Sequence, residues 1–214
     1  MIISIEGIIG AGKTTLGLAL RDEIALDGHD VTFVQEPTPK DSPWLERYYR
    51  DQKRWAFHAQ ISMLLSRLRS YRMATRGNEN TIIIMDRSVF SDRSFAHAQM
   101  SMGFMSDVEI DLYNQAYTTL IDEVSFDLIL HMNTSIEDAM DAVCLRARTQ
   151  GEVDGVTEEY QRSLREGIHR SLEETLTPIV RPARLEKWSQ QYRDQVTQLS
   201  HLICTRHEVA RQGG

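Results

Sequence analysis

Close to its start the chain reads Gly7-Ile8-Ile9-Gly10-Ala11-Gly12-Lys13-Thr14. This stretch matches the pattern G-x-x-x-x-G-K-[ST], in which a glycine-rich loop binds the phosphates of a nucleotide. Residues 2–5 before it are apolar apart from one serine, which predicts a short buried strand. Residues 15–26 after it carry apolar side chains at helical spacing and end near Gly28, which predicts a helix. A chance match in an ordinary glycine turn is the alternative, and the flanking strand and helix argue against it.

The residue types in this loop suit a triphosphate. Glycines let backbone N–H groups turn toward a phosphate, and the N-terminus of the following helix adds partial positive charge. Lys13 can reach the β- and γ-phosphates, and the Thr14 hydroxyl can bind Mg²⁺. We therefore expect the triphosphate to be held by Gly7, Gly10, Ala11, Gly12, Lys13, Thr14 and Thr15. The loop alone predicts nucleotide binding and does not identify a reaction.

Length and charge limit the classes of function. A chain of 214 residues can bury one sizeable core, and we expect a single domain over residues 1–214. The net charge of −7 argues against direct binding to nucleic acid or to an anionic membrane surface. Cys144 and Cys204 lack the spacing of a metal site, so we expect both to be reduced. With no signal peptide and no long apolar run in the sequence, we expect a cytoplasmic protein.

Two further predicted strands end in acidic residues. Residues 31–35 predict a strand that Glu36 follows, and residues 81–85 are the most apolar β-branched run, followed by Asp86 and Arg87. In an open α/β sheet, ligands bind beyond the carboxyl ends of the parallel strands. There Glu36 can take a proton from an attacking hydroxyl, and Asp86 can complete the ligand shell of Mg²⁺. The alternatives are a solvent-facing loop for Glu36 and a helix cap for Asp86.

These three strand ends are expected to share one crevice, because neighbouring strands lie about 5 Å apart. Phosphoryl transfer needs a cradle and a metal ion for the donor, cations for the developing charge, and a base near the acceptor hydroxyl. Arg87 can supply one of the cations. The guanine-recognition motif Asn-Lys-x-Asp does not occur in the sequence, which argues against a GTPase. We expect an α/β fold in three layers, with a central parallel sheet of four to five strands between helices.

The remaining pattern is mostly helical. We expect a fourth strand over 126–132 and helices over about 44–49 and on to 76, 106–122, 135–148, 158–176 and 184–206. Residues 149–156 contain two glycines and read as irregular, between Arg146 and Arg148 on one side and further arginines on the other. We interpret about 146–160 as a lid whose arginines close over the triphosphate. A solvated helix end is the alternative.

Taken together, the motifs resemble the deoxyribonucleoside kinase family, of the type that takes deoxyadenosine, deoxyguanosine or deoxycytidine. The resemblance extends from Met1 to about His169 and implies a P-loop kinase fold. The residues that carry it, in the family's order, are the phosphate loop, Glu36-Pro37, Tyr49 with Trp55 and Gln60, Arg67, Asp86-Arg87-Ser88 with Ser91-Asp92-Arg93, and Arg146/Arg148 with Glu159-Tyr160.

The resemblance implies a role for each of these positions. Glu36 would be the catalytic base on the 5′-hydroxyl, with Arg87 beside it, and Asp86 would serve Mg²⁺. Tyr49 and Glu159 would hold the 3′-hydroxyl, and Gln60 would read the base edge. An amide offers a donor and an acceptor together, which suits that task. The resemblance also implies ATP as the phosphoryl donor, a deoxynucleoside as the acceptor and a homodimer.

The pair Arg67 and Asp92 is the best indication of the substrate. In the family this pair is similar to that of members taking deoxyadenosine, deoxyguanosine or deoxycytidine, whereas thymidine-preferring members have small or apolar residues there. We therefore expect 5′-phosphorylation of a purine deoxynucleoside, with deoxycytidine as second candidate, in nucleotide salvage. The alternative role for the two residues is a buried ion pair that shapes the pocket without touching the base.

Two other functions remain open. A deoxynucleoside monophosphate kinase similar to thymidylate kinase is the nearer, but such enzymes typically carry an arginine where Gln35 precedes Glu36. A noncatalytic nucleotide-binding regulator is the more distant, since simple binding does not need groups for an acceptor. The segment 175–182 departs from the family, because a proline interrupts the place where members have a fifth strand before the loop that contacts the donor base.

Overall fold

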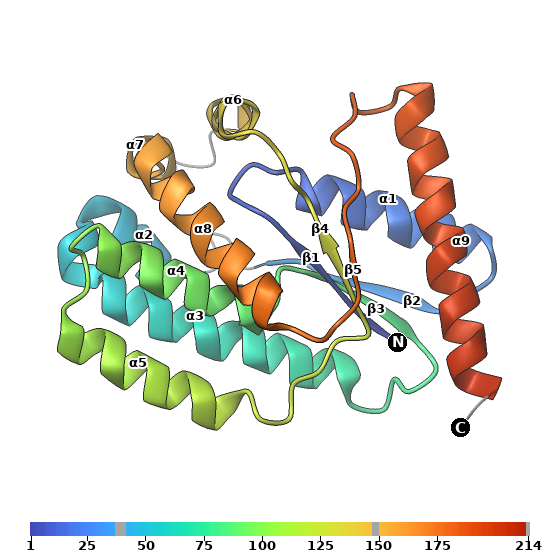
Figure 1. The fold of residues 1–214 in the computed structure, drawn as a ribbon, viewed down its shortest axis with the longest axis horizontal. Coiled ribbons are helices and arrows are strands. Elements are labelled where there is room, and N and C mark those ends of the chain that lie inside the picture. Colours follow the sequence, from blue (N-terminus) through green and yellow to red (C-terminus); the bar gives the residue numbers. More distant parts are fainter. Residues whose placement is uncertain (37–41, 147–149, 213–214) are drawn as a thin grey trace.

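The computed structural model describes residues 1–36, 42–146 and 150–212. Its five strands form one parallel sheet in the order β2-β3-β1-β4-β5 (Figure 1). The strands are β1 Ile2–Glu6, β2 Val31–Val34, β3 Ile82–Asp86, β4 Leu128–His131 and β5 Ile179–Val180. The predicted α/β fold with a central parallel sheet of four to five strands is confirmed.

The apolar run of β3 makes it a central strand, and all five of its residues are buried. It pairs with β2 on one side and β1 on the other, with Ile5 level with Asp86 and Val34 level with Met85. Because neighbouring strands are in register, the phosphate loop, Glu36 and Asp86 leave the sheet at the same edge. The predicted convergence of the three strand ends is therefore confirmed.

The helices are α1 Lys13–Leu26, α2 Pro43–Arg50, α3 Gln52–Thr75, α4 Val89–Ser101, α5 Asp107–Leu120, α6 Ile136–Arg146, α7 Gln150–Gly155, α8 Glu158–Glu174 and α9 Gln190–Gln212. Helices α1, α2, α3, α5, α6 and α8 lie close to their predicted positions, whereas α4 and α7 were not predicted and α9 is displaced. A capping box starts α5, where the Ser106 side chain accepts from the Glu109 N–H and the Glu109 carboxylate accepts from the Ser106 N–H. At α6, the Asp138 N–H donates to the Ser135 hydroxyl over 3.1 Å. Both starts were predicted.

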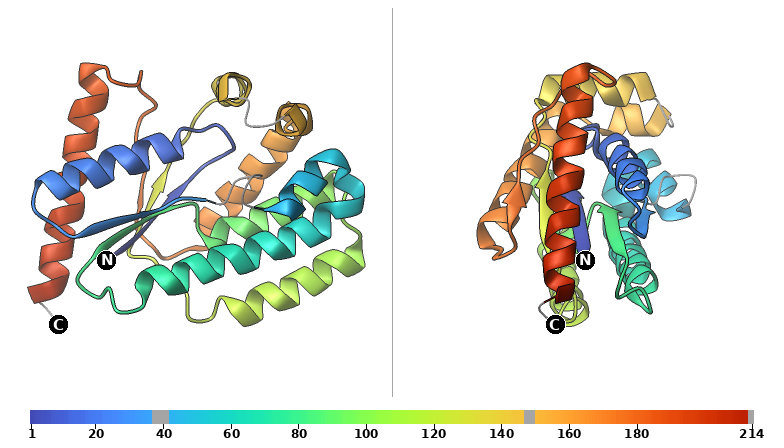
Figure 2. Two further views of the ribbon diagram at one scale, coloured as in Figure 1. Left: turned by 180° about the vertical axis from the view of Figure 1, so that it is seen from behind. Right: turned by 90° about the vertical axis from the view of Figure 1, so that its right-hand side faces the viewer.

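Helices cover both faces of the sheet. In Figure 1, α8 lies on the viewer's side of the molecule, in front of α4 and beside the strands. In the view from behind, α1 lies in front of the sheet (Figure 2). Alternating side chains explain this arrangement. The face with Ile3 and Ile84 packs on α1 and α9, and the face with Ile83 and Met85 packs on α3 and the start of α4. Helices α2 to α5 share a further apolar cluster around the fully buried Tyr113.

Three details differ from the sequence predictions. Ile179–Val180 pairs in parallel with β4, so the short segment with Pro178 does form a fifth strand, two residues long. Residues 150–155, expected to be irregular, form the six-residue helix α7. The last helix begins at Gln190 rather than near 184, after an extended segment and a turn. In each case tertiary contacts override a weak local pattern.

Two sequence expectations about the surroundings can be compared with the structure. Cys144 is exposed, Cys204 is buried, and both are free thiols. Among the described residues, no helix combines the length and the apolarity that a membrane span requires.

The phosphate loop packs tightly on α6, which generates a test. Gly10 has a φ of +83°, and a Cβ there would lie 2.2 Å from the Ala139 carbonyl oxygen. Gly28 has nearly the same φ, +84°, with nothing within 4 Å of such a Cβ. We expect Gly28→Ala to cost about 1 kcal/mol of unfolding free energy from backbone strain alone. Gly10→Ala should cost about 1–3 kcal/mol more, because backbone atoms must move. Urea unfolding measures both, and equal losses would contradict this packing.

Candidate active site

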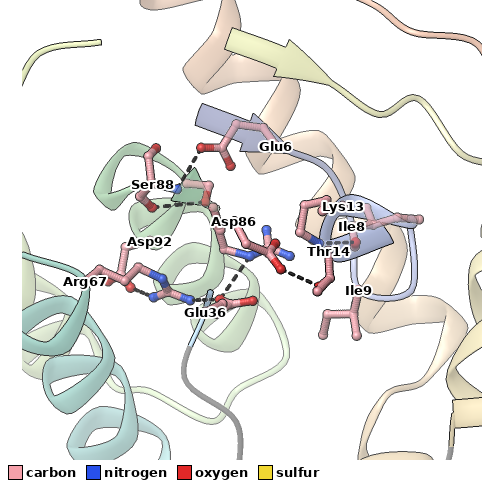
Figure 3. A network of polar contacts seen from close by, with 12 residues as sticks. Glu6, Ile8, Ile9, Lys13, Thr14, Glu36, Arg67, Asp86, Ser88 and Asp92 are labelled. Carbon is pink, nitrogen blue, oxygen red and sulfur yellow. Dashed lines mark hydrogen bonds and ion pairs between the residues drawn. The ribbon is translucent and has the colours of Figure 1, made fainter. Parts of the chain in front are cut away.

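The phosphate loop turns around a buried lysine. Lys13, at the first turn of α1, is buried, and its Nζ donates to the Ile8 carbonyl over 3.0 Å (Figure 3). The side-chain amide of Gln161 braces the loop from α8: it accepts from the Ile9 N–H over 3.1 Å and donates to the Ile9 carbonyl over 2.7 Å. The loop is therefore held in shape by α8 as well as by its own glycines.

Burial and neighbouring charges set the ionisation of Lys13. Burial lowers its pKa, and the Arg87 charge lowers it further, whereas Asp86, Glu36 and Glu6 oppose the shift; the resulting pKa is about 8. Lys13 is thus cationic at neutral pH but loses its proton far more readily than an exposed lysine.

A chain of buried charges runs across the strand ends. Glu36 follows β2 and forms ion pairs with Arg67 from α3 and with the Nε of Arg87, the latter over 3.1 Å. Arg67 also pairs with Asp92 from α4, so each guanidinium meets at least one carboxylate (Figure 3). Asp92 and Arg67 are almost fully buried, whereas 22% of the Glu36 side chain is exposed. Glu36 is therefore the member that can meet a substrate without rearranging the core.

The two guanidiniums determine the ionisation of Glu36. Burial acts to raise its pKa, but Arg87, Arg67 and Lys13 outweigh it and bring the pKa of Glu36 down to about 2. The carboxyl is accordingly ionised throughout the range in which the protein folds. An ionised carboxylate at this position can accept a hydrogen bond and a proton from an incoming hydroxyl.

The turn after β3 carries two predicted site residues. The Thr14 hydroxyl donates to the Asp86 carboxylate, and the second oxygen of Asp86 is buried without a hydrogen-bond partner among the described residues. Arg87 has a backbone φ of +74°, a conformation that residues other than glycine rarely adopt. Its guanidinium lies 4.5 Å from the centre of the Phe95 ring. The alternative role of Asp86 as a helix cap is not seen, because Ser88 caps α4.

Buried polar side chains surround Gln60. Its Nε2 donates to the Asp92 carboxylate over 2.8 Å and to the Asp92 carbonyl over 3.0 Å. Its Oε1 accepts from Gln99 over 2.9 Å, and the Tyr113 hydroxyl donates to Asp92 over 2.6 Å. Sequence reasoning missed Gln99 and Tyr113. Gln99 lies seven residues after Asp92 on α4, and Tyr113 lies on α5. In the sequence, both read as ordinary packing positions of amphipathic helices.

The predicted lid contributes Arg146 and an acidic residue that the sequence analysis did not select. Arg146 donates to the Glu152 carboxylate over 2.6 Å, and Glu152 on α7 is buried. Tyr49 and Glu152 line the same cavity. Burial raises the pKa of the Tyr49 hydroxyl, and the Glu152 charge raises it further. Glu159, by contrast, is exposed on α8 and does not line the cavity. Arg148 lies outside the described residues.

The cavity at the strand ends brings most of the predicted residues together. It encloses about 80 Å³ and is lined by Gly10, Lys13, Thr14, Glu36, Tyr49, Gln60, Arg67, Asp86, Arg87, Arg146, Glu152 and Tyr160, among others. This volume is smaller than that of a typical ligand pocket, ~300 Å³ or more. The side chains therefore satisfy one another across the site, and a ligand must exchange its own contacts for theirs.

Comparisons with known proteins agree with this arrangement. Residues 3–204 match the family model for deoxynucleoside kinases. A deoxyadenosine kinase of Dictyostelium discoideum is 30% identical over 215 residues, covering 98% of this chain and 80% of that protein. A probable deoxycytidine kinase of fowlpox virus is 36% identical over 151 residues, covering 68% of this chain and 61% of the viral protein.

A solved structure supports the fold independently. The deoxyadenosine kinase from M. mycoides, solved with dCMP and a flexible dCDP bound, superposes with a TM-score of 0.78 at 22% identity. The superposition covers 96% of this chain and all of that one. Since the family model spans residues 3–204, nearly the whole chain, this chain belongs to the deoxynucleoside kinase family.

Proposed function

We propose that this protein transfers the γ-phosphoryl group of ATP to the 5′-hydroxyl of a deoxyribonucleoside and releases the monophosphate. The observation that carries the proposal is the position of Glu36, an ionised carboxylate held between Arg67 and Arg87 on the cavity that Lys13 also lines. Phosphoryl transfer requires a base and cations within reach of one phosphate-binding loop. A noncatalytic regulator would not need this acceptor side.

In the proposed mechanism, Glu36 accepts a hydrogen bond from the 5′-hydroxyl and takes its proton as the oxygen–phosphorus bond forms. Arg87, beside Glu36, faces the charge that builds on the transferring group, and Lys13 holds the phosphates. The 5′-hydroxyl would reach Glu36 from its partly exposed side, while both guanidiniums stay paired with the carboxylate and keep it ionised.

The site fits a magnesium ion. Asp86 has one buried oxygen without a hydrogen-bond partner among the described residues, and the other lies against the Thr14 hydroxyl. Carboxylate and hydroxyl oxygens beside a phosphate loop are the donors that Mg²⁺ takes. We propose that Thr14 and Asp86 hold it. The ion would neutralise charge on the phosphate oxygens of ATP.

At the sugar end, we propose that Tyr49 and Glu152 hold the 3′-hydroxyl. Glu152 replaces Glu159 in this role, because Glu159 is exposed and lies outside the cavity. Gly151 and Gly155 support the assignment, since a Cβ on either would lie 3.0 Å from Tyr49 atoms. The two glycines let α7 close on the tyrosine, so the segment of about 146–160 acts as the lid.

At the base end, we propose that Gln60 reads the edge of the base and that Arg67 and Asp92 set which base is taken. Gln60 lines the cavity, and its amide bonds Asp92 and Gln99, so a base edge would exchange its own hydrogen bonds for these. Purine deoxynucleosides are the favoured substrates and deoxycytidine the second candidate. The names of the relatives, deoxyadenosine, deoxyguanosine and deoxycytidine kinases, support this range.

The remaining proposals concern the metabolic role, the location, the domain content and the oligomeric state of the protein. We propose a role in nucleotide salvage, a cytoplasmic location and a single domain over residues 1–214, all from the sequence and its resemblance. A homodimer is supported by exposed apolar side chains on the outer helices α3 and α5, namely Leu65, Met73, Val108 and Leu112. A monophosphate kinase is less well supported, because Gln35 before Glu36 is neutral and exposed.

The role of Glu36 is tested by Glu36→Gln. We expect turnover of deoxyadenosine with ATP to fall by ~10²–10⁴, because the amide cannot accept the proton. Equilibrium binding of deoxyadenosine should change little. The melting temperature of the variant measures whether the two arginines, now beside a neutral amide, destabilise the protein. Turnover within threefold of wild type would remove Glu36 from the mechanism.

The pKa of Lys13 predicts a pH profile. For ATP, kcat/KM reports the free enzyme and should be level below pH 8. Above pH 8 it should fall toward tenfold per pH unit, because a neutral lysine no longer attracts the triphosphate. Lys13→Arg stays charged in this range. This variant should be slower overall but lack the decline, and a level wild-type profile to pH 9.5 would contradict the prediction.

The two candidate glutamates for the sugar hydroxyl form a matched pair. Glu152→Gln should raise KM for deoxyadenosine and lower kcat/KM by ~10–100-fold, as expected when a charged hydrogen bond is lost. Glu159→Gln should leave both within twofold of wild type. Steady-state kinetics with deoxyadenosine and its 3′-deoxy analogue measure the effect, since the Glu152→Gln penalty should shrink for the analogue. A larger loss for Glu159→Gln would reverse the assignment.

A further inference from the structure

Glu6, the last residue of β1, is a buried carboxylate that the mechanism above does not use. Only 2% of its surface is exposed, and no described cationic side chain forms an ion pair with it. It lies on the sheet face opposite to Ile5, toward α4 and α8, where it lines a small cavity with Ser91 and Leu172. An ionised side chain in such a place is costly unless specific hydrogen bonds use it.

The hydrogen bonds of Glu6 lead to the turn after β3. Its Oε1 accepts from the Ser88 N–H over 2.9 Å (Figure 3). The same oxygen accepts from the Ser4 hydroxyl. Ser88 directly follows Arg87, whose φ of +74° is unfavourable for a residue with a side chain. A second bond holds the same turn, from the Arg87 N–H to the Ile5 carbonyl over 3.0 Å. The end of β1 thus binds two successive amides of the strained turn.

The turn after β3 positions two side chains of the proposed active site. Asp86 before it contacts Thr14, and Arg87 within it pairs with Glu36. A change in the turn would move both groups relative to the phosphate loop. Strain at such a position persists only where surrounding contacts hold it. The Glu6 carboxylate supplies one of these contacts, beside the Arg87 N–H bond to Ile5 and the bond from the Ser91 hydroxyl to the Ser88 carbonyl.

We propose that Glu6 is a positioning residue: its carboxylate, by binding the Ser88 amide, keeps Asp86 and Arg87 in the geometry that phosphoryl transfer needs. This inference rests on the function proposed above and extends it to a residue that touches neither donor nor acceptor. It makes two distinct demands on position 6. The side chain must carry an acceptor oxygen, and it must be long enough to reach Ser88; a negative charge is not required.

Three substitutions separate these demands. Glu6→Ala removes the acceptor, Glu6→Asp keeps the charge but shortens the reach by one methylene, and Glu6→Gln keeps both acceptor and length. Gln has nearly the same shape as Glu, and the Glu6 Oε2 that its amide nitrogen would replace has no hydrogen-bond partner among the described residues, so the substitution removes no hydrogen bond. Leu172→Ala is the matched control, because Leu172 is buried on the same small cavity as Glu6 and lines no part of the active site.

With deoxyadenosine and ATP, we expect Glu6→Ala and Glu6→Asp to lower kcat by ~10–100-fold, the range seen when residues behind a metal ligand are removed. The Mg²⁺ concentration for half-maximal activity should rise several-fold in both. Glu6→Gln should stay within threefold of wild type on both measures. Leu172→Ala should lower the melting temperature without changing either. A merely destabilised protein loses active molecules but keeps its requirement for Mg²⁺.

A second readout does not depend on activity. Hydrogen–deuterium exchange of the Ser88 amide should be faster in Glu6→Ala and Glu6→Asp than in wild type, and unchanged in Glu6→Gln and Leu172→Ala. Unchanged exchange and kinetics in Glu6→Ala, or a Glu6→Gln variant as impaired as Glu6→Ala, would overturn the proposal. If the wild type phosphorylates no deoxynucleoside, the proposed function fails, while the exchange measurement still decides whether Glu6 holds the turn.

Discussion

The site depends on a buried chain of alternating charges, Asp92 to Arg67 to Glu36 to Arg87. Each charge is compensated mainly by its neighbours in this chain, so the loss of one member leaves a poorly compensated charge in the protein interior. The chain joins α3, α4 and two strand ends, and Glu36 is its one partly exposed carboxylate. The same interaction that fixes the geometry of the core therefore delivers an ionised carboxylate to the cavity.

Much of this arrangement could be predicted from the sequence, since it follows from short-range rules. The loop that ends in Lys13 and Thr14 has a fixed spacing, and Glu36 and Asp86 directly follow apolar runs that can only be strands. Parallel pairing then brings the strand ends together without further information. The resemblance to known kinases added Arg67 and Asp92, which do form the buried ion pair named as their alternative role. The second pairing of Arg67, with Glu36, was not predicted.

What could not be predicted depends on packing between distant segments. Glu152 and Glu159 lie in similar sequence surroundings, and only the fold of α7 against Tyr49 buries the first and leaves the second in solvent. Tyr113 reads as an ordinary core aromatic, yet its hydroxyl binds Asp92. Glu6 precedes the glycine loop like any strand residue, and its partner Ser88 is 82 positions away. Contacts of this kind leave no periodic signal in the sequence.

The most direct test of the account is to supply the wild-type protein with ATP, Mg²⁺ and, in separate reactions, the four common deoxynucleosides and their four 5′-monophosphates. Proton-coupled ³¹P NMR identifies each product. The account predicts new monophosphate from purine deoxynucleosides, its signal split into a triplet by the two 5′ protons, and no diphosphate from the monophosphates. If a deoxynucleoside diphosphate forms from the monophosphates and no deoxynucleoside is phosphorylated, Glu36 is not the base for a nucleoside hydroxyl. Binding of ATP without any phosphoryl transfer would contradict the same assignment.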